Sequence, residues 1–389
     1  MKKKVLAFTA IRSEYDLLSS LYKLLDNDET IEFKIIVSGA HLSENHGYTV
    51  EDIENDGLSI LAKIETLIDS DTKASRVKSA SILFQNAIDI TSNYAPDIII
   101  YAGDREEVII ASIIGGYLEV PTIHFFGGDH VQDSHIDNPV RHATSKLSTI
   151  HMVSNEDHAH RLIKMGESKE RIFNIGSVAL DKFLNESIKS REEIKKYFTI
   201  KREFNSFAIL IFHPIPKERS KSAQIFENIL LSLERKGINT FVSYPNIDPG
   251  NKEIIDVIEQ YKNNKNFIFY HNQPRNIFIS IYKNAKFIIG NSSSGVLESA
   301  SIPIPAINVG YRQTGRKANK NVIFTNGESQ FIEEAINKAL SQEFQEMIAN
   351  ITNMYGDGKS SQKAFDIIKK NTFKDLLFKD EDILDQDDE

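Results

Sequence analysis

The sequence predicts an α/β protein made of two doubly wound, Rossmann-like domains in tandem. Short apolar runs alternate with segments of helical periodicity, and this alternation ends in a charged stretch at 189–203 and then starts again. Alternation of this kind is typical of parallel sheets covered by helices on both faces. The length of 389 residues also exceeds what one hydrophobic core usually organises. We therefore expect an N-terminal domain over 1–185 and a C-terminal domain over 204–360.

The first domain is expected to open with a buried strand at 5–11, because seven residues in succession are mostly apolar. A helix follows at 16–25, where leucines recur at 17, 18, 21, 24 and 25 and so form one face. By the same criteria, further strands are predicted at 32–37, 98–101, 120–125 and 152–154, and further helices at 79–93, 107–118 and 156–165.

The second domain repeats this order of elements. Strands are predicted at 207–212, 240–243, 266–270, 287–289 and 306–309, with helices at 225–233, 254–261 and 296–300. An amphipathic helix at 361–378 is expected to pack back onto one of the two domains. The last segment, 379–389, carries seven acidic residues and one lysine, so we expect a solvated, disordered tail.

Composition excludes several classes of protein. A hydrophobic content of 41% and a charged content of 26% are those of a soluble globular protein. Without cysteine, no disulfide or thiolate metal site can form. A net charge of −9 without a basic face argues against nucleic-acid binding. The apolar part of the N-terminus suits a strand better than a signal peptide, and no run of eighteen apolar residues suggests a membrane span. We expect a cytoplasmic protein.

Polar side chains follow the predicted strands at the point where each strand ends. In chain order these are Arg12, His41, Asp104 with Arg105, the His124 loop, His213 and a run of serines. Carboxyl ends of parallel strands meet at one edge of a sheet, and two such domains leave a cleft between these edges. Taken singly, each side chain has a structural alternative, but together they predict a ligand site.

The segment 124–142 is the richest in titratable groups. It holds histidines at 124, 130, 135 and 142, carboxylates at 129, 133 and 137, and Arg141. Such a density is costly except on the wall of a cleft, although a solvated loop is the alternative. Asp104, Asp129 and Asp137 are candidates for proton transfer. A metal site from His124, Asp129, His130 and His135 is a weaker option, because no HExxH-like spacing is present.

Two loops in the second half are suited to phosphate. The run 290–295 exposes backbone N–H groups and the hydroxyls of Ser292, Ser293 and Ser294 between a strand and a helix. It is neither a Walker A loop nor a dinucleotide-binding motif, and a simple helix cap is the alternative. Glu298 lies one turn further, within reach of a ribose. Arg312 and Arg316 offer two guanidiniums for a diphosphate, with a solvated loop as the alternative.

These motifs stand in a recognisable order: Ile11-Arg12-Ser13-Glu14-Tyr15, Ser38-Gly39-Ala40-His41, Gly103-Asp104-Arg105, His124-Phe125-Phe126-Gly127-Gly128-Asp129, Asp137-Asn138-Pro139-Val140-Arg141-His142, His213-Pro214, 290–298 and 312–316. Together they resemble the hydrolysing UDP-N-acetylglucosamine 2-epimerases of bacterial sialic-acid-type pathways, over roughly residues 4–340. The resemblance implies a glycosyltransferase-B-type architecture with a UDP-sugar in the interdomain cleft, no metal or other cofactor, and a homodimer or homotetramer.

The resemblance also implies roles for single residues. Asp104 and Asp137 match catalytic carboxylates, and Arg141 and His213 match their cationic partners. The positions that match nucleotide-binding residues are Arg12, Ser292, Ser293, Glu298 and Arg312. The implied reaction removes the C2 proton, expels UDP to give 2-acetamidoglucal, and then adds water with inverted C2 configuration, producing N-acetylmannosamine.

This sequence departs from the family pattern at three places. Phe126 replaces a carboxylate or histidine, Asp129 replaces a glutamate, and Asn138-Pro139 replaces an acidic–serine pair. Because phenylalanine cannot move a proton, either Asp129 or a nearby histidine acts as the base, or the substrate differs. An apolar side chain there suits UDP-N,N'-diacetylbacillosamine of the legionaminic-acid route. The sequence is also compatible with a non-hydrolysing epimerase or glycosyltransferase on the same fold, and with a non-catalytic sugar-nucleotide binder.

Overall fold

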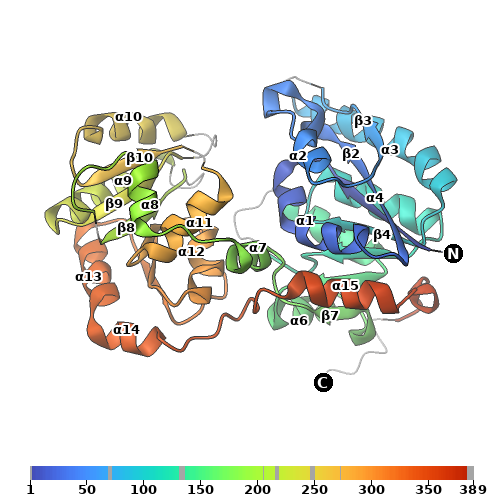
Figure 1. The fold of residues 1–389 in the computed structure, drawn as a ribbon. Coiled ribbons are helices and arrows are strands. Elements are labelled where there is room, and N and C mark those ends of the chain that lie inside the picture. Colours follow the sequence, from blue (N-terminus) through green and yellow to red (C-terminus); the bar gives the residue numbers. More distant parts are fainter. Residues whose placement is uncertain are drawn as a thin grey trace. The chain divides into compact units, whose positions relative to one another are not determined.

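The computed structural model describes residues 2–68, 72–130, 136–204, 206–214, 219–245, 250–271 and 273–382. The chain divides into two compact units, each with its own sheet (Figure 1). The first domain draws on Met1–His130, Ser134–Lys182 and Tyr355–Glu389, and the second on Phe183–Met354. The chain therefore leaves the first domain, builds the second, and returns to the first.

The first domain holds a seven-stranded sheet in the order β3-β2-β1-β4-β5-β6-β7. Its strands are β1 (Lys3–Thr9), β2 (Ile31–Ser38), β3 (Ile60–Ile64), β4 (Ile98–Ala102), β5 (Thr122–Phe125), β6 (Ile150–Val153) and β7 (Ile172–Asn174). All neighbouring strands pair in parallel. The strand order reverses direction between β1 and β4, which is the switch point where doubly wound sheets bind ligands.

Helices cover both faces of this sheet, as a parallel sheet requires. They are α1 (Arg12–Asp26), α2 (Val50–Asn55), α3 (Lys73–Tyr94), α4 (Glu106–Tyr117), α5 (Asp137–Leu147), α6 (Glu156–Lys164), α7 (Ala179–Asn185, which runs into the second domain) and α15 (Ser360–Lys370). Alternate residues of β1 enter different cores: Val5 packs in the cluster that contains α1 and α15, and Leu6 in the cluster that contains α3 and α4. The final helix thus packs on the first domain, beside α1 (Figure 1).

The second domain holds a six-stranded parallel sheet in the order β10-β9-β8-β11-β12-β13. Its strands are β8 (Phe207–Ile211), β9 (Asn239–Ser243), β10 (Phe267–Tyr270), β11 (Ile288–Gly290), β12 (Ala306–Val309) and β13 (Val322–Thr325). Its helices are α8 (Arg191–Tyr197), α9 (Arg219–Arg235), α10 (Asn251–Tyr261), α11 (Arg275–Asn284), α12 (Ser293–Leu297), α13 (Ser329–Leu340) and α14 (Gln342–Ile348). The switch point lies between β8 and β11.

Three segments differ from their predicted character. The helix predicted at 361–378 ends at Lys370, as α15. The charged stretch 189–203 contains α8, which begins in a capping box between Ser190 and Glu193 and buries Ile194 in the second domain. The predicted acidic tail is attached to the first domain at two positions, because Lys379 and Glu381 bond to buried residues, whereas Asp380 and Asp382 are exposed. Residues 383–389 lie outside the described part of the chain. Among the described helices, none has both the length and the hydrophobicity for a membrane crossing.

Candidate functional site

Arg141 organises the candidate site of the first domain. Its side chain is only 6% exposed, and its guanidinium pairs with the carboxylates of Asp104 and Asp129, the latter at 3.2 Å from Nη1. Nη1 also donates to the carbonyl oxygen of Phe126 at 3.1 Å. A planar guanidinium presents several donors in a fixed geometry, so one buried side chain can hold several acceptors. Arg141 thereby joins the loops after β4 and β5 to helix α5.

Asp129 has a second partner that the sequence did not indicate. His158, on α6, places Nε2 3.3 Å from Oδ1 of Asp129. The chain can approach α6 this closely because the preceding residue is Gly128, at φ +75°: a Cβ there would lie 2.3 Å from the carbonyl oxygen of His158. The predicted helix at 156–165 contained His158, but nothing in its spacing marked it as part of the site.

Phe126 adopts a left-handed backbone conformation, with φ +65°. This region is unusual for a bulky residue and is tolerated only where surrounding contacts fix it. Here the N–H of Phe126 donates to Met152 at 3.2 Å and its carbonyl accepts from Arg141. Its ring is half-buried and packs against the core of the first domain. Phe126, which departs from the family pattern, therefore has a strained backbone that is held by hydrogen bonds, one of them to the arginine that pairs with the carboxylates.

Asp137 is the first residue of α5 and is partly exposed. It precedes Arg141 by one helical turn and so lies on the same face of α5. Its charge also acts on Arg76, whose pKa is raised first by a hydrogen bond to Glu106 and further by Asp137. The three predicted carboxylates thus all belong to the first domain, two of them bonded to Arg141 and the third on the same helix as Arg141.

His124 has a structural role in place of the weaker metal-ligand alternative. It is fully buried; Nε2 lies 2.8 Å from the carbonyl oxygen of Gly103 and Nδ1 lies 3.1 Å from Oγ of Ser145. Burial lowers the pKa of His124 to about 3, so the ring is neutral and its Nε2–H donates to Gly103. Across the described residues no three His, Asp or Glu side chains gather as a metal site needs, and His135 lies outside them.

At the ends of β1 and β4, Arg105 is held by carboxylates. Its Nε donates to Oε1 of the buried Glu107 at 2.8 Å. Burial and the neighbouring Glu107 raise the pKa of Glu14 well above its usual value, which favours the protonated form. Glu14 stands in one of the sequence motifs but had no predicted role, because its burial cannot be read from one sequence.

The two other predicted ligand residues of the first domain differ in accessibility. Arg12 begins α1 with its side chain 70% exposed and forms an ion pair of 3.4 Å with Asp52. His41 is fully buried; its two ring nitrogens lie 3.1 Å from Oγ1 of Thr9 and 2.8 Å from Oγ1 of Thr49. Since both nitrogens are engaged inside the fold, we assign His41 a structural role and leave it out of the proposed ligand-binding residues.

In the second domain, the fully buried Asn291 forms hydrogen bonds with His213 and Arg312, which were predicted site residues, and with Gln313. Its side-chain amide bonds to both the N–H and the carbonyl of His213, each at 2.8 Å. Its own carbonyl accepts from Arg312 at 3.1 Å and from Gln313 at 3.0 Å. The preceding Gly290, at φ +134°, allows this, because a Cβ there would lie 2.0 Å from the carbonyl oxygen of Ile211. The neighbours of Asn291 were predicted as site residues, but Asn291, which connects them, was missed.

The serine run is bonded largely within itself. Oγ of Ser292 accepts from the N–H of Ser294, while Oγ of Ser294 donates to the carboxylate of Glu298. Ser293 begins α12, which spans only five residues where a helix at 296–300 was predicted. Arg316 donates to Oε1 of Gln313 at 3.1 Å. The predicted nucleotide residues of this domain therefore form one connected loop system at the ends of β11 and β12.

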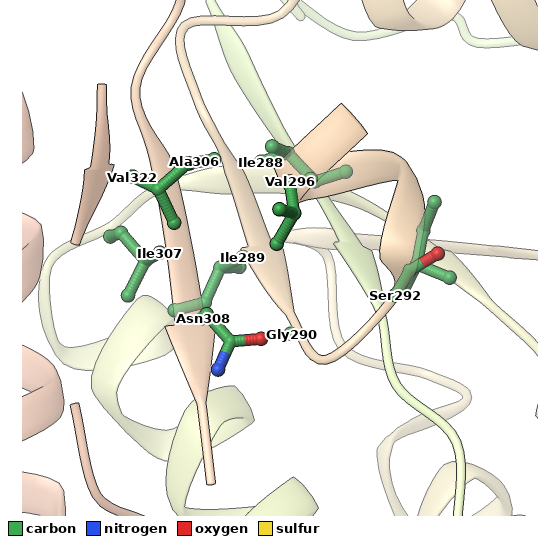
Figure 2. A pocket seen from close by; sticks show the side chains of 11 residues that line it. Ile288, Ile289, Gly290, Ser292, Val296, Ala306, Ile307, Asn308 and Val322 are labelled. Carbon is green, nitrogen blue, oxygen red and sulfur yellow. The ribbon is translucent and has the colours of Figure 1, made fainter. Parts of the chain in front are cut away.

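Figure 2 shows a crevice beneath this loop system, lined mainly by aliphatic side chains, with Ser292 and Asn308 as polar residues. Its volume of about 10 Å³ admits no more than one water molecule. The crevice is therefore not a sugar-nucleotide pocket. It shows instead that the serine loop rests on a closely packed apolar base, which holds the loop in place.

Two doubly wound domains, each with charged and hydroxyl side chains at the carboxyl ends of its strands, define a two-domain α/β protein of the glycosyltransferase-B class. Residues 23–369 match the family described as UDP-N-acetylglucosamine 2-epimerase. The chain belongs to this family, which confirms the predicted family and fold class.

Similar proteins support this assignment. The chain is 30% identical to the UDP-N,N'-diacetylbacillosamine 2-epimerase (hydrolyzing) of Legionella pneumophila, covering 95% of this chain and 96% of that protein. It is also 30% identical to a UDP-N-acetylglucosamine 2-epimerase of Neisseria meningitidis serogroup B, covering 93% and 94%. The crystal structure of a Neisseria meningitidis UDP-GlcNAc 2-epimerase bound to UDP-GlcNAc superposes with a TM-score of 0.75 at 18% identity, over 95% and 100% of the two chains.

Proposed function

We propose that this protein is a hydrolysing UDP-N-acetylglucosamine 2-epimerase, which converts UDP-N-acetylglucosamine and water to N-acetylmannosamine and UDP. The observation that carries the proposal is the Arg141 cluster, in which one buried guanidinium holds Asp104 and Asp129 side by side. Paired carboxylates beside a fixed cation suit a reaction that removes and returns a proton while negative charge develops. The family membership and the names of the similar proteins support the same reaction class.

In the proposed reaction, a base takes the proton from sugar C2 while the bond from C1 to the UDP oxygen breaks. The electron pair of the C2–H bond forms the C1–C2 double bond of 2-acetamidoglucal, and UDP leaves with the electrons of the C1–O bond. Water then loses a proton to a carboxylate as its oxygen bonds to C1, and the electrons of the C1–C2 double bond take up a proton on the opposite face of C2. We assign the base to Asp129, because Phe126 cannot serve, with Asp104 and Asp137 as the further proton-transfer groups and Arg141 as their cationic partner.

The leaving group needs positive charge and hydrogen-bond donors that are in place before UDP departs. We propose that Arg312 and Arg316 bind the diphosphate and that Glu298 accepts a hydrogen bond from the ribose, while His213 is, with Arg141, a cationic partner of the catalytic carboxylates. The remaining residues proposed to contact the nucleotide are Arg12, Arg105, Ser292, Ser293 and Ser294. The support is local: these second-domain residues belong to one system of loops joined through Asn291 and Gln313.

Phe126 favours a second substrate, UDP-N,N'-diacetylbacillosamine. An apolar residue whose main-chain carbonyl shares Arg141 with the carboxylates suits a sugar that carries a methyl group or an acylated amine where N-acetylglucosamine has hydroxyls. The Legionella protein named for that substrate is as similar to this chain as the Neisseria protein named for UDP-N-acetylglucosamine. The two substrates share the acetamido group at C2, so the proposed chemistry is the same for both.

The test is to incubate the purified protein in deuterated water with a panel of UDP- and GDP-linked acetamido sugars, and to follow products by phosphorus and proton NMR. Release of UDP together with a free C2-inverted sugar that carries deuterium at C2 supports the proposal. A C2-inverted sugar still attached to UDP would show a non-hydrolysing epimerase. Nucleotide-sugar binding without deuterium exchange would show a non-catalytic binder. Either result would overturn the proposed function.

We also propose that the protein is a cytoplasmic homodimer or homotetramer, as the family resemblance implies. Helix α3 carries an apolar stripe of Val77, Phe84 and Ile88, which are 71%, 36% and 38% exposed and spaced by seven and four residues. This spacing matches the seam along which two helices pair, so a second copy of α3 fits the stripe. Light scattering on Phe84→Glu, with the exposed Gln85→Glu as control, tests this: only Phe84→Glu is expected to lower the mass.

A further inference from the structure

The chain segment after α15 returns across the first domain and is fastened by Arg171. We call residues 374–382 the C-terminal strap. Arg171 is 2% exposed and donates to main-chain carbonyls of Leu376 and Phe378 in the strap, while its Nε lies 2.5 Å from Oε1 of Glu381. A buried guanidinium with this many partners is a strong anchor, since removing them would leave its charge uncompensated. The strap is therefore an integral part of the domain.

Lys379 of the strap reaches the end of the helix that carries Arg141. Its Nζ donates to the carbonyl oxygens of Ser145 at 3.2 Å and Lys146 at 3.0 Å, in the last turn of α5. Carbonyls at the end of a helix lack partners within the helix and carry partial negative charge, so a lysine there is stabilising. Lys379, which is not part of α5, thus binds the C-terminal end of that helix.

The same ammonium group pairs with Glu167, which has no exposed side-chain surface. Glu167 also accepts from Nε2 of His151 and pairs with Lys146, both at 2.7 Å. Burial raises the pKa of Glu167, but the hydrogen bond from His151 and the charges of His151 and Lys379 lower it more, to about 2. A buried ionised carboxylate is stable only when cations pair with it. The ion pair of Lys379 and Glu167 therefore holds both side chains in place inside the domain.

From this ion pair, direct contacts lead to the candidate site. Oγ of Ser145 is 3.0 Å from the carbonyl oxygen of Arg141 and 3.1 Å from Nδ1 of His124. The other nitrogen of His124 holds the Gly103 carbonyl, which immediately precedes Asp104. The hydroxyl of Ser145 has one proton, which it can donate either to the Arg141 carbonyl or to Nδ1 of His124, so the last turn of α5, which Lys379 holds, contacts both residues.

We infer that Lys379 is a positioning residue for the Arg141 cluster. Lys379 ties the last turn of α5 to buried Glu167. It thereby fixes the position of α5 along its axis and its rotation about that axis, and so the positions of Arg141 and Asp137. Lys379 touches neither Asp104 nor Asp129, so it acts only through α5. Its effect on turnover rests on the proposed function, whereas its effect on α5 does not.

The experiment compares Lys379→Met with the wild type. Methionine keeps much of the side-chain length but lacks the charge and the donors. Lys379→Arg restores a cation, and Lys374→Met, an exposed lysine of the same strap, is the matched control. Three quantities are measured: hydrogen exchange of the peptide that covers 137–147, kcat and KM for UDP release, and Tm.

We expect Lys379→Met to speed exchange in 137–147 and to lower kcat by about tenfold, because small displacements of catalytic groups are costly, while KM changes less than about twofold. Lys379→Arg should recover most of kcat, and Lys374→Met should match the wild type. Unchanged exchange in 137–147 with unchanged kcat would overturn the inference. So would faster exchange throughout the first domain without rescue by arginine, because that pattern indicates general destabilisation. If the wild type releases no UDP, the proposed function fails, and hydrogen exchange alone decides the role of Lys379.

Discussion

Asn291 holds the main chain of His213 from both sides: its Oδ1 accepts from the N–H and its Nδ2 donates to the carbonyl, each at 2.8 Å. This pairing joins the ends of β8 and β11, the two strands at the switch point of the second domain. A side-chain amide is suited to this position because it carries one acceptor and two donors. The backbone of His213 is therefore fixed by a neighbouring strand rather than by its own loop.

Replacing Asn291 by alanine should lower both stability and nucleotide affinity. The change removes two hydrogen bonds to the part-buried main chain of His213, each of which contributes roughly 0.5–1.5 kcal/mol. Urea unfolding measures the loss of stability, and calorimetric titration with UDP measures affinity. The exposed Asn86→Ala is the control. Unchanged UDP affinity in a destabilised Asn291→Ala protein would show that the pairing serves only the fold.

Arg141→Lys should abolish most turnover although it preserves the charge. A lysine ammonium cannot reproduce the planar array of donors with which Arg141 holds Asp104, Asp129 and the Phe126 carbonyl. We expect kcat for UDP release to fall by roughly 100-fold or more. The control is Arg235→Lys on α9, an exposed arginine paired with Glu333. A kcat within a few-fold of wild type would show that a single positive charge suffices at this position.

Asp104→Asn should stop the reaction while leaving UDP-sugar binding. The amide keeps the size of the side chain but can neither take up a proton as a base nor pair ionically with Arg141. Turnover is followed by phosphorus NMR and binding by calorimetry on the same preparation. Turnover at the wild-type rate would remove Asp104 from the mechanism.

Arg312→Ala should mainly weaken binding of the nucleotide. The substitution removes one proposed diphosphate ligand and one hydrogen bond to the Asn291 carbonyl, which Gln313 still satisfies. Affinity for UDP should fall by roughly tenfold to 100-fold, the range expected for a charge-assisted hydrogen bond. Lys320→Ala, an exposed cation beyond the same loop, is the control. Equal UDP affinity in both variants and the wild type would exclude the loop from the site.

His41 should make the protein sensitive to acid. Burial lowers the pKa of His41 to about 4, whereas an unfolded chain takes up this proton near pH 6.5. Between these values the unfolded state binds more protons, so this contribution to stability is complete above pH 6.5 and is lost as the pH falls towards 4. The loss amounts to roughly 3 kcal/mol.

Urea unfolding of the wild type and of His41→Gln between pH 7 and pH 4 measures this effect. Stability of the variant should depend less steeply on pH, and the exposed His46→Gln should behave as the wild type. UDP affinity at pH 7 should be the same in all three proteins. A markedly weaker UDP affinity in His41→Gln alone would return His41 to the nucleotide site.

Much of the fold could be predicted because buried parallel strands are short apolar runs. The strand at 98–101 matches β4, and the strand at 306–309 matches β12. Helix α8 was missed because its few apolar residues stand among charges. The edge strand β3 (Ile60–Ile64) was missed because its surroundings are polar and its residues are only partly buried.

The sequence predicted many of the residues of the candidate site, but not which hydrogen bonds and ion pairs connect them. Asp104 and the loop of Asp129 were predicted to follow strand ends, and Arg141 was noted in the same titratable segment as Asp129; the structure brings the three side chains together. Burial is the reason why we assign structural roles to His41 and His124, and one sequence does not reveal that burial. No single sequence reveals that Asn291 joins His213 to the arginine loop, because asparagine is common in loops of every kind.

The return of the chain to the first domain has a consequence for how the protein is made. Ala364, Ile368 and Phe373 belong to the same core cluster as Val5 and Leu18. On the ribosome, the first domain must therefore wait for nearly the whole polypeptide before its interior is complete. The strands β8 to β13 of the second domain lie in one stretch of the chain and are available earlier. An expression fragment that stops near residue 185 would leave an apolar helix-binding surface uncovered, and joining 355–382 to it would be needed to close that surface.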